Sequence, residues 1–273
     1  MNYIGSKFSL IDFLMTSINK TLETNEENRA PEEMVFADLL AGTGVVCRAF
    51  ADAGYNVIAN DIQYYSYVIN KHLLGNSGKL DKARCEELVE KLNNLDGVEG
   101  FIYKNYSYGG TEGQEFRRMY FSDNNAKKCD AMRQKIESWK NDGEINENEY
   151  FFLLASLINS VDKYANTASV YGAYLKKLKK SAEKDMVLSP LPITDNVFGA
   201  EVYNRDILDL LDEVSGDILY LDPPYNARQY CSNSHLLETI ARYDEPEIKG
   251  KTGLRDYSAQ KSNFCITGKV EEF

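Results

Sequence analysis

The sequence predicts an α/β protein whose mostly parallel sheet is divided by a mainly helical insertion. Short apolar runs, which are typical of buried parallel strands, occur at residues 34–40, 55–59 and 217–221. The first is followed by a glycine turn, the second by an acid, and the third by an acid and a proline pair. Between the second and third runs, residues 79–95, 124–140 and 148–165 show the apolar spacing of helices. A further strand is expected at residues 200–203. The insertion is expected at residues 62–198.

Composition restricts the class of protein before any motif is considered. The chain has 273 residues, 43% apolar and 27% charged, which suits a globular protein and excludes a collagen-like or largely disordered one. It has no run of about 18 apolar residues and no signal peptide, so we expect a cytoplasmic protein with no membrane partner. Five scattered cysteines and two histidines predict neither a metal site nor a disulfide framework.

The charge is unevenly distributed along the chain. The net charge of −11 argues against a nucleic-acid partner, because phosphates attract basic surfaces. Residues 162–184, however, hold six lysines and two acids, a local net charge of +4. A run of this kind either binds phosphates or forms an ordinary solvated face, and without further motifs the second interpretation is favoured.

The first predicted βαβ unit follows an amphipathic helix at residues 8–21. The strand at 34–40 runs into Ala41-Gly42-Thr43-Gly44, a helix follows at 45–54, and the next strand ends at Asn60-Asp61. Glycines here let a backbone approach a ligand, and an acid after the second strand can accept hydrogen bonds from ribose hydroxyls. Because the turn at 41–44 forms neither GxGxxG nor GK[ST], a nucleoside without pyrophosphate, such as S-adenosylmethionine, suits the site better than a dinucleotide. An ordinary strand–helix turn is the alternative.

The second motif, Asp222-Pro223-Pro224-Tyr225, follows the predicted strand at 217–221. Prolines fix the backbone and remove donors, which leaves carbonyls exposed at the carboxyl end of the strand. An acid, a carbonyl and an aromatic ring together can bind a flat base that carries an amino group. A satisfied Pro-Pro turn is the alternative, but the preceding strand and the upstream glycine turn favour a functional site.

These motifs together resemble those of alpha-group, Dam-like adenine-specific DNA methyltransferases of restriction–modification systems, and most closely the FokI-type modification methylases. Residues 2–7 (NYIGSK) resemble the N-terminal motif, 38–44 the cofactor motif, 204–207 (NRDI) the acidic motif and 222–225 the catalytic tetrapeptide. Segments 171–176, 226–230 and 235–239 resemble the same subgroup. The resemblance implies a Rossmann-like, S-adenosylmethionine-dependent methyltransferase core formed by residues 1–61 and 199–273.

The resemblance also implies roles for individual residues. Lys7 is expected to hold the methionine carboxylate of the cofactor, Asp61 its ribose and Asp206 its adenine. Asp222 is the expected catalytic acid. The full expected cofactor set is Tyr3, Lys7, Asp38, Ala41, Gly42, Thr43, Gly44, Asp61, Ile62, Asp206, Ile207 and Asp222. The expected catalytic set is Asp222, Pro223, Pro224 and Tyr225.

The insertion at 62–198 is then expected to be the target-recognition domain for duplex DNA. Expected DNA contacts are Arg117, Arg118, Lys176, Lys177, Lys179, Lys180 and Arg228. The implied function is methylation of the 6-amino group of adenine in a short DNA site, in a bacterial, nucleoid-associated protein. Methylation would protect that site from a cognate restriction endonuclease, which shares the site and need not bind the methylase.

The C-terminal part departs from the family pattern. After Tyr225 we expect a helix at 232–243 and at most one more helix, with no clear strand. The expected sheet is therefore incomplete, with an exposed edge, and its closing strands would come from a missing C-terminal part or a second methylase domain. Two alternatives remain: a truncated, non-catalytic fragment that binds DNA and cofactor, and methylation of another planar amine, namely cytosine, RNA adenine or a glutamine amide.

Overall fold

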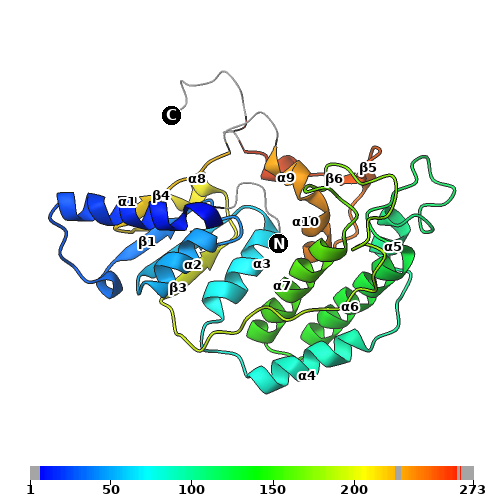
Figure 1. Ribbon diagram of the computed structural model, residues 1–273, viewed down its shortest axis with the longest axis horizontal. Helices are drawn as coiled ribbons and strands as arrows, with labels where there is room; N and C mark the ends of the chain where they lie inside the picture. Colours follow the sequence, from blue (N-terminus) through cyan, green and yellow to red (C-terminus); the bar gives the residue numbers. More distant parts are fainter. Residues whose placement is uncertain (1–6, 225–228, 263–264, 266–273) are drawn as a thin grey trace. The chain divides into compact units, whose positions relative to one another are not determined.

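The computed structural model describes residues 7–224, 229–262 and 265, which divide into two compact units (Figure 1). Of these residues, 7–79 and 193–223 form the sheet unit, and the remainder form the helical unit. The first break, after Lys79, and the last, after Pro223, differ from the predicted domain bounds. The break after Pro192 lies six residues before the predicted end of the insertion at residue 198.

The sheet unit contains four strands, all parallel, in the order β3-β2-β1-β4 (Figure 1). The strands are β1 (Val35–Asp38), β2 (Asn56–Asn60), β3 (Ala200–Tyr203) and β4 (Ile218–Tyr220). Ala37 of β1 pairs with Ile58 on one side and with Leu219 on the other. This arrangement confirms the predicted strands and the parallel, divided core.

One face of the sheet is covered by helices. A cluster of Phe36, Val57, Phe50 and Leu74 packs with the apolar side chains of α1 (Ile11–Thr24), which follows a short 3₁₀ turn (Phe8–Leu10). Phe50 belongs to α2 (Val45–Asp52), and its ring stacks on that of Phe36 with centroids 3.8 Å apart. Leu74 belongs to a π-helical turn (Lys71–Gly75) after α3 (Tyr64–Asn70). This packing is why residues 62–79 belong to the sheet unit and not to the insertion.

The opposite face of the sheet packs against fewer residues of the unit. Ala37, Leu39 and Ile58 pack there with Leu210 of the short helix α8 (Ile207–Leu210). Among the described residues β4 is an edge strand, and the side chains of Leu219 and Leu221 are 54% and 48% exposed. The predicted exposed edge is thus present in the described part of the sheet.

The helical unit is built around α7 (Glu147–Tyr164), in which Phe151, Phe152, Leu153 and Leu154 are all buried. The other helices are α4 (Lys82–Asn93), α5 (Phe101–Tyr106), α6 (Asp123–Asn141), α9 (Tyr230–Asn233) and α10 (His235–Arg242). The three predicted long helices and the predicted helix at 232–243 are confirmed. In the described residues no helix is both long and apolar enough to cross a membrane.

Two features of this unit differ from expectation. Tyr103 and Tyr106 lie in α5, which is not among the predicted helices; Asp130 caps this helix by accepting the backbone N–H groups of Ile102 and Tyr103 at 2.9 and 2.8 Å. A small antiparallel hairpin, β5 (Ile248–Lys249) and β6 (Leu254–Arg255), was not expected at all. Residues 230–260 belong to the helical unit because the buried Arg133 of α6 donates to the carbonyls of Ile240 and Ala241 in α10.

Candidate active site

The glycine turn between β1 and α2 has a backbone that only glycine adopts easily at two positions. Gly42 and Gly44 have φ angles of 53° and 73°, in the left-handed region. The amide of Ala41 donates to the carbonyl of Asn60 at 2.8 Å, which ties the turn to the end of β2. Ala41 is buried and Thr43 is half-buried. The turn is therefore a fixed backbone surface at the carboxyl edge of the sheet, where parallel α/β proteins bind ligands.

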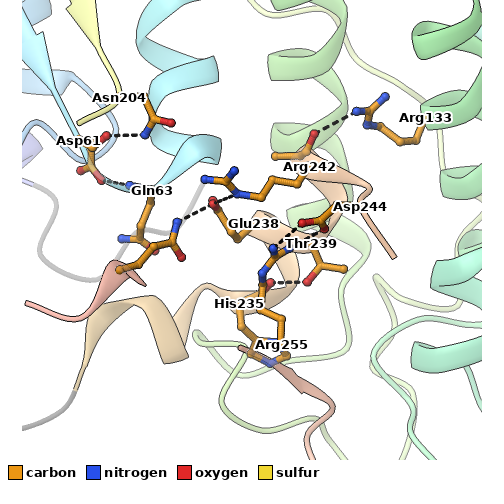
Figure 2. Close-up of polar contacts among 12 residues, drawn as sticks. Asp61, Gln63, Arg133, Asn204, His235, Glu238, Thr239, Arg242, Asp244 and Arg255 are labelled. Carbon is orange, nitrogen blue, oxygen red and sulfur yellow. Dashed lines mark hydrogen bonds and ion pairs between the residues drawn. The ribbon is translucent and has the colours of Figure 1, made fainter. Parts of the chain in front are cut away.

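Asp61 follows β2 and holds both the turn and the start of α3. One carboxylate oxygen accepts the N–H of Gly42 at 2.9 Å, and the other accepts the N–H of Gln63 at 2.8 Å. The Asp61 carbonyl accepts from the side chain of Asn204 at 2.7 Å (Figure 2). Asp61 is 7% exposed, and its neighbour Ile62 is half-buried. A carboxylate has about four lone-pair positions, so it can accept more hydrogen bonds than these two.

Asp38 is the last residue of β1 and is only 1% exposed. The pKa of its carboxyl is raised to about 7, chiefly by burial and in addition by the charges of Asp61 and Asp222, while the Leu40 N–H and Lys7 act to lower it. The Leu40 N–H lies 3.1 Å from the carboxylate. Three carboxylates from the ends of β1, β2 and β4 are thus electrostatically coupled.

Asp222 lies two residues after the end of β4 and forms an ion pair with Lys7. The Lys7 side chain is 18% exposed and that of Asp222 is 31% exposed, so the pair is partly screened from water. Pro223 and Pro224 are half-buried. The structure brings together Lys7, Asp38, Asp61 and Asp222, which come from four separate segments of the chain.

Asp206 is placed differently from these acids. It is exposed, and its carboxylate accepts the N–H of Leu208 at 2.9 Å as the N-cap of α8. The same segment is fixed by Asn60, whose side chain donates to the carbonyl of Arg205 at 3.1 Å. A helix-capping acid is what the structure shows at this position, and contact with cofactor adenine stays a prediction. Ile207 is half-buried at the start of α8.

The arrangement suits a positively charged nucleoside. Three carboxylates against one lysine leave a negative potential at the carboxyl edge, beside the glycine turn. S-adenosylmethionine carries a sulfonium and an ammonium group together with ribose and a carboxylate, and each has a complementary partner among these residues. The cofactor chemistry expected from the sequence therefore fits the side chains present.

The two arginines expected to contact DNA have different environments in the helical unit. Arg117 is exposed, with its guanidinium 3.5 Å from the centroid of the Tyr108 ring. Arg118 is 5% exposed and donates to the carbonyls of Gly250 and Lys251 at 2.9 and 3.3 Å. Arg118 therefore anchors the β5–β6 hairpin, and its guanidinium is not placed on a surface where a phosphate approaches.

The predicted basic segment is an irregular loop and not a helix face. Lys176, Lys177 and Lys180 are exposed, while Lys179 is half-buried and donates to the carbonyl of Thr167 at 2.9 Å. The hydroxyl of Tyr174 donates to the carbonyl of Arg117 at 2.9 Å, which places this loop beside the exposed arginine. We call Arg117, Lys176, Lys177 and Lys180 the basic surface.

Three expected site residues lie outside the described part of the chain, namely Tyr3, Tyr225 and Arg228. Sequence reasoning also overlooked Asn70 of α3, which is 1% exposed and donates to the Gly42 carbonyl at 3.0 Å. The expected domain boundary after Asp61 placed it in the insertion. The sequence does contain a feature that could have identified Asn70. The polar residues Gln63, Ser66 and Asn70 are spaced by three and four positions in an otherwise apolar segment, which places them on one face of a helix.

Comparisons with known proteins match the chain to one family of DNA methyltransferases. The model of the D12 class N6 adenine-specific DNA methyltransferase family matches residues 3–272. The chain is 51% identical to the type II methyltransferase M.NlaIII of Neisseria lactamica over 99% of its length and 77% of that protein. It is 43% identical to M.FokI of Planomicrobium okeanokoites and 38% identical to the modification methylase StsI of Streptococcus sanguinis. The alignments with M.FokI and StsI each cover 99% of this chain, but only 41% of M.FokI and 40% of StsI. No solved structure matches the chain.

Proposed function

Because the chain belongs to the D12 class of N6 adenine-specific DNA methyltransferases, we propose that its sheet unit binds S-adenosylmethionine and that Asp222 directs the methyl group to adenine. The substrate would be the 6-amino group of adenine in a specific duplex DNA sequence. The observation that carries this proposal is the meeting of Asp38, Asp61, Asp222 and Lys7 beside the glycine turn.

The cofactor would lie across the carboxyl edge of β1 and β2. Asp61 would accept hydrogen bonds from the ribose hydroxyls while it keeps its bond to Gly42. Lys7 is the cation of the cluster and would pair with the methionine carboxylate. Asp38 would supply a negative charge near the sulfonium group of the cofactor. When bound, S-adenosylmethionine supplies a methyl group activated by the sulfonium charge.

Asp222 acts on the amine. The lone pair of the adenine amino group is delocalised into the ring, so the free base is a poor nucleophile. An N–H···O bond to Asp222 and a second to the Pro223 carbonyl favour a tetrahedral nitrogen with a localised lone pair. The same carboxylate stabilises the positive charge that develops on nitrogen during in-line attack. No strong base is needed, since the proton leaves after transfer.

The target base must leave the duplex to reach Asp222, at a cost of about a few kcal/mol for unstacking and unpairing. The basic surface of the helical unit offers four exposed cations for phosphate contacts. Target recognition by the part of the predicted insertion that lies in the helical unit, residues 80–192, is part of this proposal. Since M.NlaIII is named a type II methyltransferase and StsI a modification methylase, we infer that methylation protects DNA from a cognate restriction endonuclease.

Transfer of labelled methyl groups tests the proposal. The protein is incubated with S-adenosylmethionine labelled in the methyl group and with unmethylated genomic DNA, and the nucleosides are then separated. We expect label in N6-methyladenine only. Label in N4-methylcytosine would overturn the base assignment. Binding of cofactor without any label in DNA would support a non-catalytic, cofactor-binding fragment.

A further inference from the structure

We propose that Asn70 is a positioning residue that fixes the glycine turn in its cofactor-binding form. The inference rests on the proposed cofactor site and adds a residue that no motif assigns. Asn70 ends α3, is 1% exposed and lies in the sheet unit with the turn. Its amide nitrogen donates to the carbonyl of Gly42 at 3.0 Å and to that of Ser66 at 2.9 Å.

Gly42 is held from both sides by side chains of different elements. Its N–H donates to Asp61 at 2.9 Å, and its carbonyl accepts from Asn70. Because a trans peptide points its N–H away from its C=O, the bond to Asn70 also directs the Thr43 N–H away from α3. That N–H is thus oriented as a donor at the carboxyl edge. Without Asn70, a glycine with a φ of 53° has many alternative conformations.

Asn70 also accounts for the glycine at position 44. A Cβ on Gly44 would collide with Oδ1 of Asn70, and the φ of 73° disfavours any other residue. Oδ1 is buried and has no hydrogen-bond partner among the described residues. Since a buried, unpaired polar atom is costly, packing alone would favour an apolar side chain here. The amide group is therefore best explained by its bond to the turn.

Asn70→Ala is the variant that tests the proposal, with calorimetric Kd values for S-adenosylmethionine and steady-state rates. We expect the Kd and the cofactor KM to rise about tenfold or more, since a buried carbonyl loses its donor. We expect kcat at saturating cofactor to stay within about twofold of wild type, because Asn70 does not touch the adenine. A folding defect would give the opposite pattern, a smaller active fraction with an unchanged Kd.

Ser66→Ala is the matched control. Ser66 is 0% exposed, one turn earlier on the same helix, and its hydroxyl has no partner among the described residues, while its backbone carbonyl remains available to Asn70. Its Kd should equal that of the wild type. If Asn70→Ala does not fold, Asn70→Leu replaces it, because leucine keeps most of the side-chain volume while removing the amide. Its Kd is compared with those of the wild type and Ser66→Ala in the same way.

Two outcomes contradict the proposal and are distinguishable. If the wild type binds cofactor and Asn70→Ala binds it equally well, the positioning role is wrong while the proposed function stands. If the wild type itself binds no S-adenosylmethionine, the proposed function fails and this inference fails with it.

Discussion

At the scale of single residues, environment decides what each predicted group can do. Asp38 and Asp206 are both acids at the carboxyl edge, but Asp38 is buried among charges while Asp206 is an exposed helix cap. Arg117 and Arg118 are adjacent in sequence, yet one is exposed and the other anchors a hairpin. The motifs were predictable because each is local. The partners of Arg118 were not, since Gly250 lies 132 residues away.

The raised pKa of Asp38 predicts a pH-dependent cofactor affinity. Below a pKa of about 7 the carboxyl is neutral, and above it a negative charge attracts the sulfonium. We expect the Kd for S-adenosylmethionine to fall by about tenfold between pH 6 and pH 8. Asp38→Asn should remove most of that change, while titration of the ligand itself is common to both proteins. Calorimetry at each pH measures the Kd. Equal pH profiles of the Kd for the wild type and Asp38→Asn would refute the role given to Asp38. The charged groups that face position 38, namely Asp61, Asp222 and Lys7, are the same in the wild type and in Asp38→Asn.

At the scale of elements, the strands and long helices were predictable and the short elements were not. Strands β1, β2 and β4 coincide with apolar runs that have clear ends. Helices α6 and α7 are long enough for the helical spacing of their apolar residues to be recognised. The short helix α5 depends on Asp130, 28 residues beyond Ile102. The hairpin β5–β6 depends on Tyr106, whose hydroxyl donates to the Gly253 carbonyl at 2.8 Å, and on Arg118. Contacts of this kind are absent from any local pattern.

The cap on α5 predicts a stability effect. Asp130→Ala leaves the N–H groups of Ile102 and Tyr103 without their acceptor, and removes the carboxylate to which the Tyr243 hydroxyl donates. We expect the free energy of unfolding to fall by about 2–4 kcal/mol, measured by urea denaturation. The exposed acid Glu86 on α4 is the control, and Glu86→Ala should change it by less than about 0.5 kcal/mol. Similar effects of both substitutions would show that Asp130 does not cap α5.

At the scale of the whole molecule, the acidic cluster and the basic surface belong to different units. The net charge is −11, and three carboxylates lie together in the sheet unit, while the four cations of the basic surface belong to the helical unit. The exposed edge of the sheet at β4 was predicted from the shortage of strand signals after Tyr225. The bounds of the compact units were not predicted, because the chain returns from the sheet unit to the helical unit within the Asp222–Tyr225 motif.

The basic surface predicts how DNA affinity depends on salt. Replacing Lys176, Lys177 and Lys180 by Gln should weaken DNA binding and reduce the slope of log Kd against log salt by up to about 3. A control that changes the net charge equally replaces Lys82, Lys91 and Lys140 of α4 and α6. Fluorescence anisotropy over a salt series measures both. Equal slopes in the two triple variants would place the phosphate contacts elsewhere.

The most direct test of the account is the separation of cofactor binding from methyl transfer. Asp61→Asn and Asp222→Asn are compared for the Kd of S-adenosylmethionine and for the single-turnover rate of N6-methyladenine formation. We expect Asp61→Asn to weaken cofactor binding. Asp222→Asn should bind cofactor within about threefold of wild type and lose a factor of about 10²–10³ in rate. Formation of N6-methyladenine by Asp222→Asn at the wild-type rate would contradict the central claim that Asp222 activates the amine.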